Sequence, residues 1–381
     1  MLDMARVREV FAASQDFTVG LEEEFHLLDP ATLSLTQRFE ELFEAGGADP
    51  VLAGSLAGEL ISSEIEIRSG RGESFADALA RQREARVRLA RLAAEHGVRL
   101  GATGSHPWSP WQEQHIIETA HYRRLREELR YVARRNNTFS LHVHVGINGA
   151  DRAIAVCDRL RPVLPELLAL SASSPFLDRE DSGLASARTQ IFTKSFPRCG
   201  IPEPFGSFAA YAAHIEWLRR TGSIAEATQL WWSVRPHHSF GTVEVRICDA
   251  QPSASESSAL AALIVACVAQ TALDVDDDMP AAPRPGRMVE ENLWRAIRYG
   301  LDGRMIDLDR GEEFPAAAIA DRLLAWTAPA RAALGLEPAL ADENAAGRQQ
   351  RAIAEGATIE EAFGYEVDLT ERTYATEEVT T

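Results

Sequence analysis

The stretch FTVGLEEEFHLLD, residues 17–29, combines the signals of a buried strand and of a charged surface. Its β-forming residues predict a strand over 17–28, yet Glu22, Glu23 and Glu24 stand in the middle of it. Carboxylates are rarely buried without partners. Residues two apart on a strand share a face, so Glu22 and Glu24 lie on one face and Glu23 on the other. We expect a charged sheet face at the first two, and a cost of at most about 1–3 kcal/mol on replacing Glu23.

Three further predicted strands repeat this arrangement. Each carries two ionisable residues two positions apart: Glu64 and Glu66 in 58–70, His142 and His144 in 138–147, and Glu244 and Arg246 in 241–249. A sheet face of this kind must contact water or be neutralised by cations. A solvated face explains each pair alone, but four pairs on strands rich in Val, Ile and Leu favour a cation site. Carboxylates with one or two histidines suit magnesium or manganese.

Several arginines are candidates for binding phosphate or carboxylate oxygens through bidentate hydrogen bonds: Arg188, Arg198, Arg235 and Arg246. Together with a metal site they suggest a phosphorylated or nucleotide substrate. The sequence contains neither GxxxxGK[ST] nor GxGxxG, so any ATP would bind without a P-loop. The HVH pair also suggests a zinc hydrolase, but no HExxH motif supports that alternative.

Lys194 is the one lysine in the sequence and lies in RTQIFTKSFPRCGIPEPFG, residues 188–206. We predict a loop-rich region over 175–206, stiffened by its prolines. Two interpretations stay open for Lys194: a surface lysine, or a phosphate or substrate contact in an active-site loop between Arg188 and Arg198.

The composition excludes some classes of protein. A net charge of −18 argues against a general nucleic-acid or membrane-surface binder. The longest apolar run, 259–269, is too short to span a bilayer and reads as a buried helix. The chain opens without a signal-peptide pattern. The four cysteines form no CxxC pair and show no zinc-ligand spacing, which indicates reduced thiols: Cys157, Cys199, Cys248 and Cys267. We expect a cytoplasmic protein.

Strands and helices are mixed without the regular alternation of a parallel sheet. This favours an α+β fold, with an antiparallel sheet and helices packed on one side of it. We predict a single catalytic domain over 1–370 and a flexible tail over 371–381. Within the domain, the sheet-forming part covers about 17–250, and a wholly helical part covers about 254–365. The predicted helices are 4–13, 37–45, 74–95, 119–135, a proline-kinked 150–173, and 208–221.

Five motifs occur in a characteristic order between residues 17 and 303: GLEEEF, ELISSEIE, LHVHVGI, WWSVRPHHSFGTVEVRICDA and ENLWRAIRYGLDG. In this combination the chain resembles the YbdK-type carboxylate–amine ligases. These form the glutamate–cysteine ligase type 2 family of the glutamine-synthetase-like superfamily. Two segments, IRSG after Glu66 and NNTFS before LHVHVGI, depart from the family pattern and bear on the identity of the amine.

The resemblance implies a curved, mainly antiparallel sheet with helices on its outer face and ATP and Mg²⁺ or Mn²⁺ on its concave face. It implies that ATP, L-glutamate and an amine such as L-cysteine give a γ-glutamyl amide, ADP and phosphate through an acyl phosphate. It also implies small-molecule substrates and a homo-oligomer, for instance a dimer. The implied metal ligands are Glu22, Glu24, Glu59, Glu66, His142 and Glu244.

The resemblance further implies catalytic roles for Arg246 and Arg235, and it places His144 near the substrate. Arg188, Lys194 and Arg198 complete the expected substrate or nucleotide contacts. Glu59 and Glu66 are seven positions apart, so an ideal strand would put them on opposite faces; Glu59 must lie in a preceding loop or across a bulge. Glu64 shares a face with Glu66 and competes for its role.

Two other functions fit the same fold. A guanidino-kinase-like phosphotransferase would release a phosphorylated product and no amide. A non-catalytic nucleotide- or metal-binding protein would keep the fold without turnover. The intact set of carboxylates and arginines argues against the non-catalytic alternative.

Overall fold

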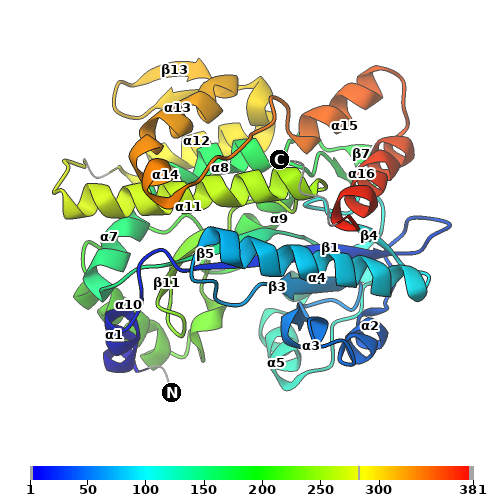
Figure 1. Ribbon diagram of the computed structural model, residues 1–381, viewed down its shortest axis with the longest axis horizontal. Coiled ribbons are helices and arrows are strands. Elements are labelled where there is room, and N and C mark those ends of the chain that lie inside the picture. Colours follow the sequence, from blue (N-terminus) through cyan, green and yellow to red (C-terminus); the bar gives the residue numbers. More distant parts are fainter. Residues whose placement is uncertain (1–2, 282–283, 377–381) are drawn as a thin grey trace.

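A seven-stranded antiparallel sheet forms the centre of the computed structural model, which describes residues 3–281 and 284–376 (Figure 1). The strand order is β10-β11-β5-β1-β3-β2, and β4 also pairs with β1. The sheet confirms the predicted α+β class. Its strands are β1 (Val19–Leu28), β2 (Leu56–Ala57), β3 (Glu64–Arg68), β4 (Arg99–Gly101), β5 (Leu141–Gly146), β10 (Val234–His237) and β11 (Thr242–Val245).

The two faces of the sheet differ in chemistry because the side chains alternate. Val19 and Leu21 on β1 stand opposite Val145 and Val143 on β5, and all four side chains are buried in one apolar core. Glu22 and Glu24 on β1, and His142 and His144 on β5, alternate with these apolar residues and point to the other face. Glu22 stands opposite His142 on β5 and opposite Arg68 on β3, while Glu24 stands opposite Glu66.

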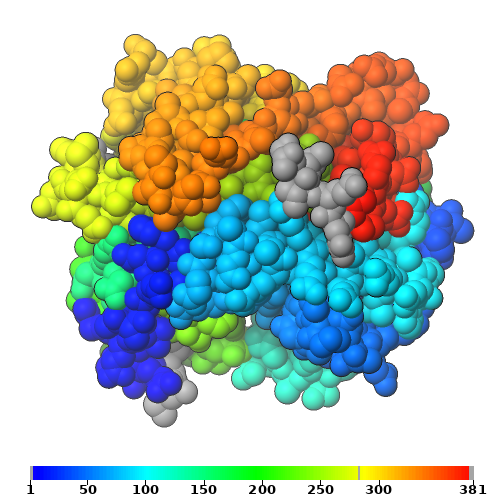
Figure 2. Space-filling model, viewed as in Figure 1, coloured from blue at the N-terminus to red at the C-terminus, as the bar shows by residue number. Residues whose placement is uncertain are grey.

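Helices cover the apolar face, with α4 and α11 running across it (Figure 1). Figure 2 shows the C-terminal helices as a layer along the N-terminal half of the molecule. The helices are α1 (Met4–Ala12), α2 (Phe39–Gly46), α3 (Leu52–Ser55), α4 (Phe75–Glu95), α5 (Ala120–Leu129), α6 (Tyr131–Arg134), α7 (Ala150–Leu160), α8 (Leu164–Ser171), α9 (Ala187–Ser195), α10 (Phe208–Arg220), α11 (Ala254–Asp276), α12 (Gly286–Tyr299), α13 (Ile319–Trp326), α14 (Ala328–Leu334), α15 (Ala345–Ala354) and α16 (Ile359–Tyr374).

The apolar run at 259–269 belongs to α11, which begins at an N-cap where Ser253 accepts a hydrogen bond from the Glu256 amide. By its length and composition alone, this helix is long and apolar enough to cross a membrane. However, 78% of its most apolar window is buried inside the protein, as in the core helix of a globular domain.

Five predicted segments need correction. The predicted helix 119–135 is two helices, α5 and α6, separated by Arg130 at φ +51°. The loop-rich region contains α9, which Ser186 caps and which ends before Pro197. The proline-kinked helix is two helices, α7 and α8. The wholly helical C-terminal part contains a hairpin of β12 (Arg304–Asp307) and β13 (Glu312–Pro315), whose turn uses Gly311 at φ +68°. Helix α16 continues through the start of the predicted tail to Tyr374; residues 377–381 lie outside the described residues.

Short strands and 3₁₀ turns complete the structure outside the main sheet. The strands are β6 (Phe176–Leu177), β7 (Glu180–Asp181), β8 (Cys199–Gly200) and β9 (Trp231–Trp232). The β8–β9 pair is parallel and joins the end of α9 to the segment that leads into β10. The 3₁₀ turns are η1 (Trp111–Glu113), η2 (Ala227–Gln229), η3 (Gly300–Asp302) and η4 (Ala316–Ala318).

Candidate active site

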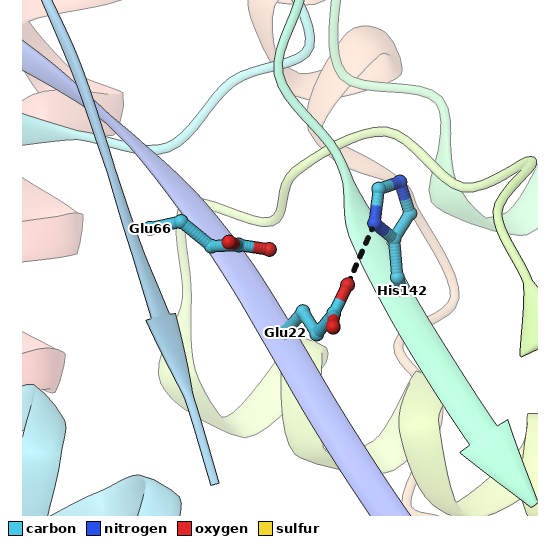
Figure 3. Close-up of side chains that lie close together, drawn as sticks. All are labelled: Glu22, Glu66 and His142. Atoms are coloured by element: carbon cyan, nitrogen blue, oxygen red, sulfur yellow. Dashed lines mark hydrogen bonds and ion pairs between the residues drawn. The ribbon is translucent and has the colours of Figure 1, made fainter. Parts of the chain in front are cut away.

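The charged sheet face brings together side chains from four neighbouring strands. Figure 3 shows Glu22 on β1 between Glu66 on β3 and His142 on β5. His142 Nδ1 lies 3.3 Å from Glu22 Oε2, and His144 Nε2 lies 3.4 Å from Glu22 Oε1. Glu244 on β11 extends the row, with its Oε1 3.9 Å from His144 Nε2. The strand alternation that predicted a shared face for these pairs is confirmed.

Glu59 reaches this face from the loop between β2 and β3, as the spacing argument required. Its side chain is about one-third exposed, and its Oε1 lies 3.7 Å from a guanidinium nitrogen of Arg68. Glu64 and Glu66 both lie on the charged face, and both are buried.

Three overlapping groups of side chains are compact enough to bind a metal ion. Within each group the candidate ligand atoms lie within 4.8 Å of one another: Glu22, Glu66 and His142; Glu22, His144 and Glu244; and Glu24, Glu59 and Glu66. All six predicted metal ligands belong to these groups. His144, predicted near the substrate, belongs to them as well.

The histidine hydrogen bonds leave suitable lone pairs facing the carboxylates. The Ser140 hydroxyl donates to Glu24 Oε2 (2.7 Å) and lies 2.8 Å from His142 Nε2. With the Ser140 proton on Glu24, a donor at Nε2 of His142 would leave the Nδ1 lone pair for a cation bound between Nδ1 and Glu22. His144 Nδ1 lies 3.0 Å from the Thr242 hydroxyl, so a donor at Nδ1 leaves Nε2 free to bind a cation.

Buried polar atoms without partners show that the face fits a divalent ion. Among the described residues, Glu66 Oε1, Glu64 Oε2 and His144 Nε2 are buried and have no hydrogen-bond partner. Such atoms normally have partners in folded proteins. Oxygen ligands with one imidazole nitrogen suit Mg²⁺ or Mn²⁺, and no cysteine belongs to the three groups.

The raised pKa values of Glu59 and Glu66 indicate that the nearby cations are too few to neutralise all the carboxylates of the charged face. Burial and the charge of Glu24 raise the pKa of Glu59 to about 8. Burial and the charges of Glu22 and Glu59 raise the pKa of Glu66 well above its ordinary value. Burial alone would raise the pKa of Glu22, but His144 and His142 hold it well below that value. Part of the cluster is therefore protonated at neutral pH unless cations neutralise it.

Arg235 and Arg246 both bind Glu244 at the edge of the face. Arg235 makes a bidentate pair with this carboxylate (2.6 and 3.1 Å) and donates to the Leu230 carbonyl (2.6 Å), which occupies most of its donors. Arg246 donates to Glu244 through one terminal nitrogen, and its buried Nε has no partner among the described residues. Of the two predicted arginines, Arg246 has more free donors for a substrate.

Arg68 is a part of the site that we did not predict. It lies among three carboxylates: its Nε donates to Glu66 (2.6 Å), and its guanidinium lies 3.7 Å from Glu22 and from Glu59. Ser140 is the second such residue. Both follow the period of two that places Glu64, Glu66, His142 and His144, so extending the alternation by one step would have identified them.

The three remaining predicted contacts have partners other than the carboxylates of the charged face. Lys194 is on α9, about half exposed, and pairs with Glu290 (2.8 Å). Arg198 donates to the Gln229 carbonyl and stacks over Trp231. Arg188 lines the cavity described below, but it donates to the carbonyls of Arg246 and Ile247. The structure thus brings Arg188 to the site and leaves Lys194 and Arg198 outside it.

Glu23 points to the helical layer, as predicted, but it is not an isolated hydrogen-bonding group. Its carboxylate makes a bidentate pair with Arg86 on α4 (2.6 and 2.7 Å), and both side chains are buried. Gln82, Ser257 and Tyr374 also donate to it. This buried ion pair raises the expected cost of replacing Glu23, because an unpaired buried guanidinium is more costly than a lost hydrogen bond.

Two cavities open onto the charged face. The main cavity, about 260 Å³, is lined by Glu22, Glu24, Glu59, Glu64, both histidines of β5 and Arg246, and it extends to α5 and α9. The adjoining cavity, about 370 Å³, lies between α1, the start of β1 and residues 239–242. Glu22, Arg68, His144 and Phe240 line both, so the cavities meet over the ligand groups.

Comparisons with known proteins agree with this geometry. The sequence model of Glutamate-cysteine ligase family 2 (GCS2) matches residues 18–360. A protein of Rubrobacter xylanophilus named "Putative glutamate--cysteine ligase 2-2" is 38% identical over 94% of this chain and 92% of its own length. One of Sorangium cellulosum named "Putative glutamate--cysteine ligase 2" is 40% identical over 81% of this chain and 82% of its own.

Solved structures show the same fold at low sequence identity. Glutamate–cysteine ligase of Francisella tularensis in complex with AMP has a TM-score of 0.65 at 11% identity, covering 96% of this chain and 91% of that one. A bifunctional glutathione synthetase of Pasteurella multocida has a TM-score of 0.65 at 13% identity, over 97% of this chain and 54% of that one. The family match confirms the predicted class of enzyme, a ligase that forms a carbon–nitrogen bond. The chain belongs to glutamate–cysteine ligase family 2.

Proposed function

We propose that the protein is an ATP-dependent ligase that joins the γ-carboxylate of L-glutamate to an amine such as L-cysteine. The observation that carries this proposal is the set of three overlapping ligand groups on one sheet face, with Arg246 beside them. The names of the relatives and the AMP complex of a protein with the same fold support it.

The chemistry explains why such a face is needed. A carboxylate is a poor electrophile, but its acyl phosphate reacts readily with an amine. Forming the acyl phosphate brings the γ-carboxylate of glutamate close to the triphosphate. Mg²⁺ or Mn²⁺, held by Glu22, Glu24, Glu59, Glu66, His142 and Glu244 with His144, would supply the positive charge that this encounter requires.

The protein's own side chains then have distinct roles. Arg246 would bind the transferring phosphoryl group or the substrate carboxylate through its free donors. Arg235 would hold Glu244 in place by its bidentate pair. Ser140 and Thr242 would fix the ring orientations of His142 and His144.

We assign the nucleotide base to the adjoining cavity. Its walls include the backbone of Gly20 and Gly70, the exposed ring of Phe240, and the cations Arg68 and Arg71. Planar bases stack on aromatic rings, and arginines bind polyphosphate. The attacking and leaving oxygens of a phosphoryl transfer lie roughly in line, so glutamate would approach from the main cavity on the other side.

Three broader expectations stay predictions: a single catalytic domain over 1–370, a cytoplasmic location and a homo-oligomer.

The decisive experiment measures ADP release from ATP and Mg²⁺ with L-glutamate, with and without L-cysteine, and identifies the product by mass spectrometry. We expect amide formation with one ADP per amide. A phosphorylated product without an amide would instead indicate a phosphotransferase. Full turnover of an amine other than cysteine would support the ligase activity and show that the acceptor is a different amine.

A further inference from the structure

One end of the main cavity has aromatic walls. Phe192 on α9, Phe196 after it and Trp231 on β9 all line the cavity. The ring centroids of Phe192 and Phe196 are 4.8 Å apart, and those of Phe196 and Trp231 are 5.3 Å apart. Phe192 and Trp231 are only partly buried, so their rings are available to a ligand. We call this part of the cavity the aromatic slot.

Helix α5 lines the same cavity with Tyr122 and Leu125. Trp231 packs against the hydrophobic cluster that contains Leu125, so the slot is bounded by apolar atoms from α5 and from β9. The helix is held there by hydrogen bonds from its polar side to the segment before β9: His121 Nδ1 lies 2.9 Å from Glu226, and Gln229 donates to Glu128 (2.6 Å).

Two arginines beside the slot already have partners. Arg188 donates to backbone carbonyls, and Arg198 donates to the Gln229 carbonyl while its guanidinium lies 5.7 Å from the Trp231 ring centroid. The slot therefore offers apolar contact, whereas Arg71 lines only the adjoining cavity and Arg68 lies where the two cavities meet. This difference in charge assigns the polyphosphate to the adjoining cavity and leaves the slot for an uncharged group.

We propose that the acceptor of this ligase is a primary amine with an apolar body of aromatic size, seated in the aromatic slot. The inference rests on the proposed function. The cysteine side chain has little apolar surface to bury against the three aromatic rings of the slot, whereas a phenyl-sized group can stack on them. The carboxylate face lines the same cavity, so the amine of such an acceptor would point toward it. The shared chemistry includes a free arylalkylamine and the α-amino group of an aromatic amino acid.

The bond changes of the acceptor step are simple. The amine nitrogen attacks the carbonyl carbon of the acyl phosphate, and a C–N bond forms. The C–O bond to phosphate breaks, and phosphate leaves with the bonding electron pair. The proton of the attacking amine passes to water.

The test compares acceptors with the full chain, ATP, Mg²⁺ and L-glutamate. Hydroxylamine is included because it is small enough to trap an acyl phosphate as a hydroxamate without filling the slot. We expect kcat/KM for 2-phenylethylamine or L-phenylalanine to exceed that for methylamine and L-cysteine by at least about 30-fold, a realistic discrimination for a hydrophobic pocket. The comparison of 2-phenylethylamine with L-phenylalanine tells whether the acceptor is a free arylalkylamine or an aromatic amino acid.

Variants test whether the slot causes this preference. Trp231→Ala and Phe192→Ala should lower the ratio of kcat/KM for the aromatic amine to that for hydroxylamine by about 10-fold or more. Trp217→Ala, a half-exposed tryptophan on α10 outside the cavity, is the matched control and should keep the ratio.

The outcomes are separable. If hydroxylamine gives a hydroxamate but L-cysteine or methylamine is the best amine, the acceptor assignment is overturned and the ligase activity is supported. An aromatic preference that survives in both slot variants would overturn it too. Absence of both hydroxamate and ADP release would overturn the proposed function itself.

Discussion

Replacing Glu23 tests the structure at a point where the tertiary contacts change the magnitude expected from the sequence. Glu23→Gln keeps the shape of the side chain but removes the negative charge that faces Arg86. Both residues are buried, at 4% and 3% exposure, so the guanidinium would be left without a counter-charge in a low-dielectric environment. Removing one partner of a buried pair typically costs about 3–5 kcal/mol.

The expected change in melting temperature follows from the size of the chain. At about 2.1 cal/mol/K per residue, the unfolding entropy of 381 residues is roughly 0.8 kcal/mol/K. A loss of about 3–5 kcal/mol then lowers Tm by about 4–6 °C. The pair also depresses the pKa of Glu23, mainly through Arg86 acting against the effect of burial, so its stabilisation is present at neutral pH and is lost as pH falls.

The assay is thermal denaturation followed by circular dichroism, without metal, for the wild type, Glu23→Gln and Glu22→Gln. Glu22→Gln is the control on the opposite face of the same strand. Because His144 and His142, acting against the effect of burial, depress the pKa of Glu22, its neutralisation should also lower Tm, but by less than Glu23→Gln, whose partner Arg86 is a permanently charged buried guanidinium. Glu22→Gln should abolish ADP release, whereas Glu23→Gln should retain turnover below its Tm. A Glu23→Gln protein within about 1 °C of the wild type, or one less destabilised than Glu22→Gln, would refute the reasoning.

Three other predictions concern the charged face. Arg246→Lys should reduce kcat by about 100-fold or more with an unchanged circular-dichroism spectrum, because a point charge cannot replace a planar fork of donors; near wild-type kinetics would make Arg246 structural. Excess EDTA should abolish ADP release, and Mg²⁺ or Mn²⁺ should restore it without zinc; turnover that persists in EDTA would contradict the metal site. The Tm of the metal-free protein should fall as pH rises from about 5 to 8. The pKa of Glu59, about 8, and that of Glu66 are raised, so the folded state binds more protons than the unfolded state in this window. Mg²⁺ should reverse the fall and Glu59→Gln should flatten it, whereas a Tm that rises over this range would contradict the assignment.

The backbone period of a strand determined which residues share the charged face. Glu22, Glu24, His142, His144 and Glu244 could be assigned from the sequence, because alternation is a local property of extended backbone. Arg68 and Ser140 follow the same period, so the sequence also contains the information that places them on this face. Family motifs added Glu59, which no periodicity could place.

Tertiary structure alone decided which charges pair with one another. Glu23 meets Arg86 and Tyr374, which lie 63 and 351 positions away in the sequence, and no local pattern encodes such partners. Lys194 faces Glu290 and not the site because the expected loop is a helix. The aromatic slot likewise exists only where α5, α9 and β9 meet. Alternation fixes the direction of a side chain, whereas its partner depends on how distant segments pack.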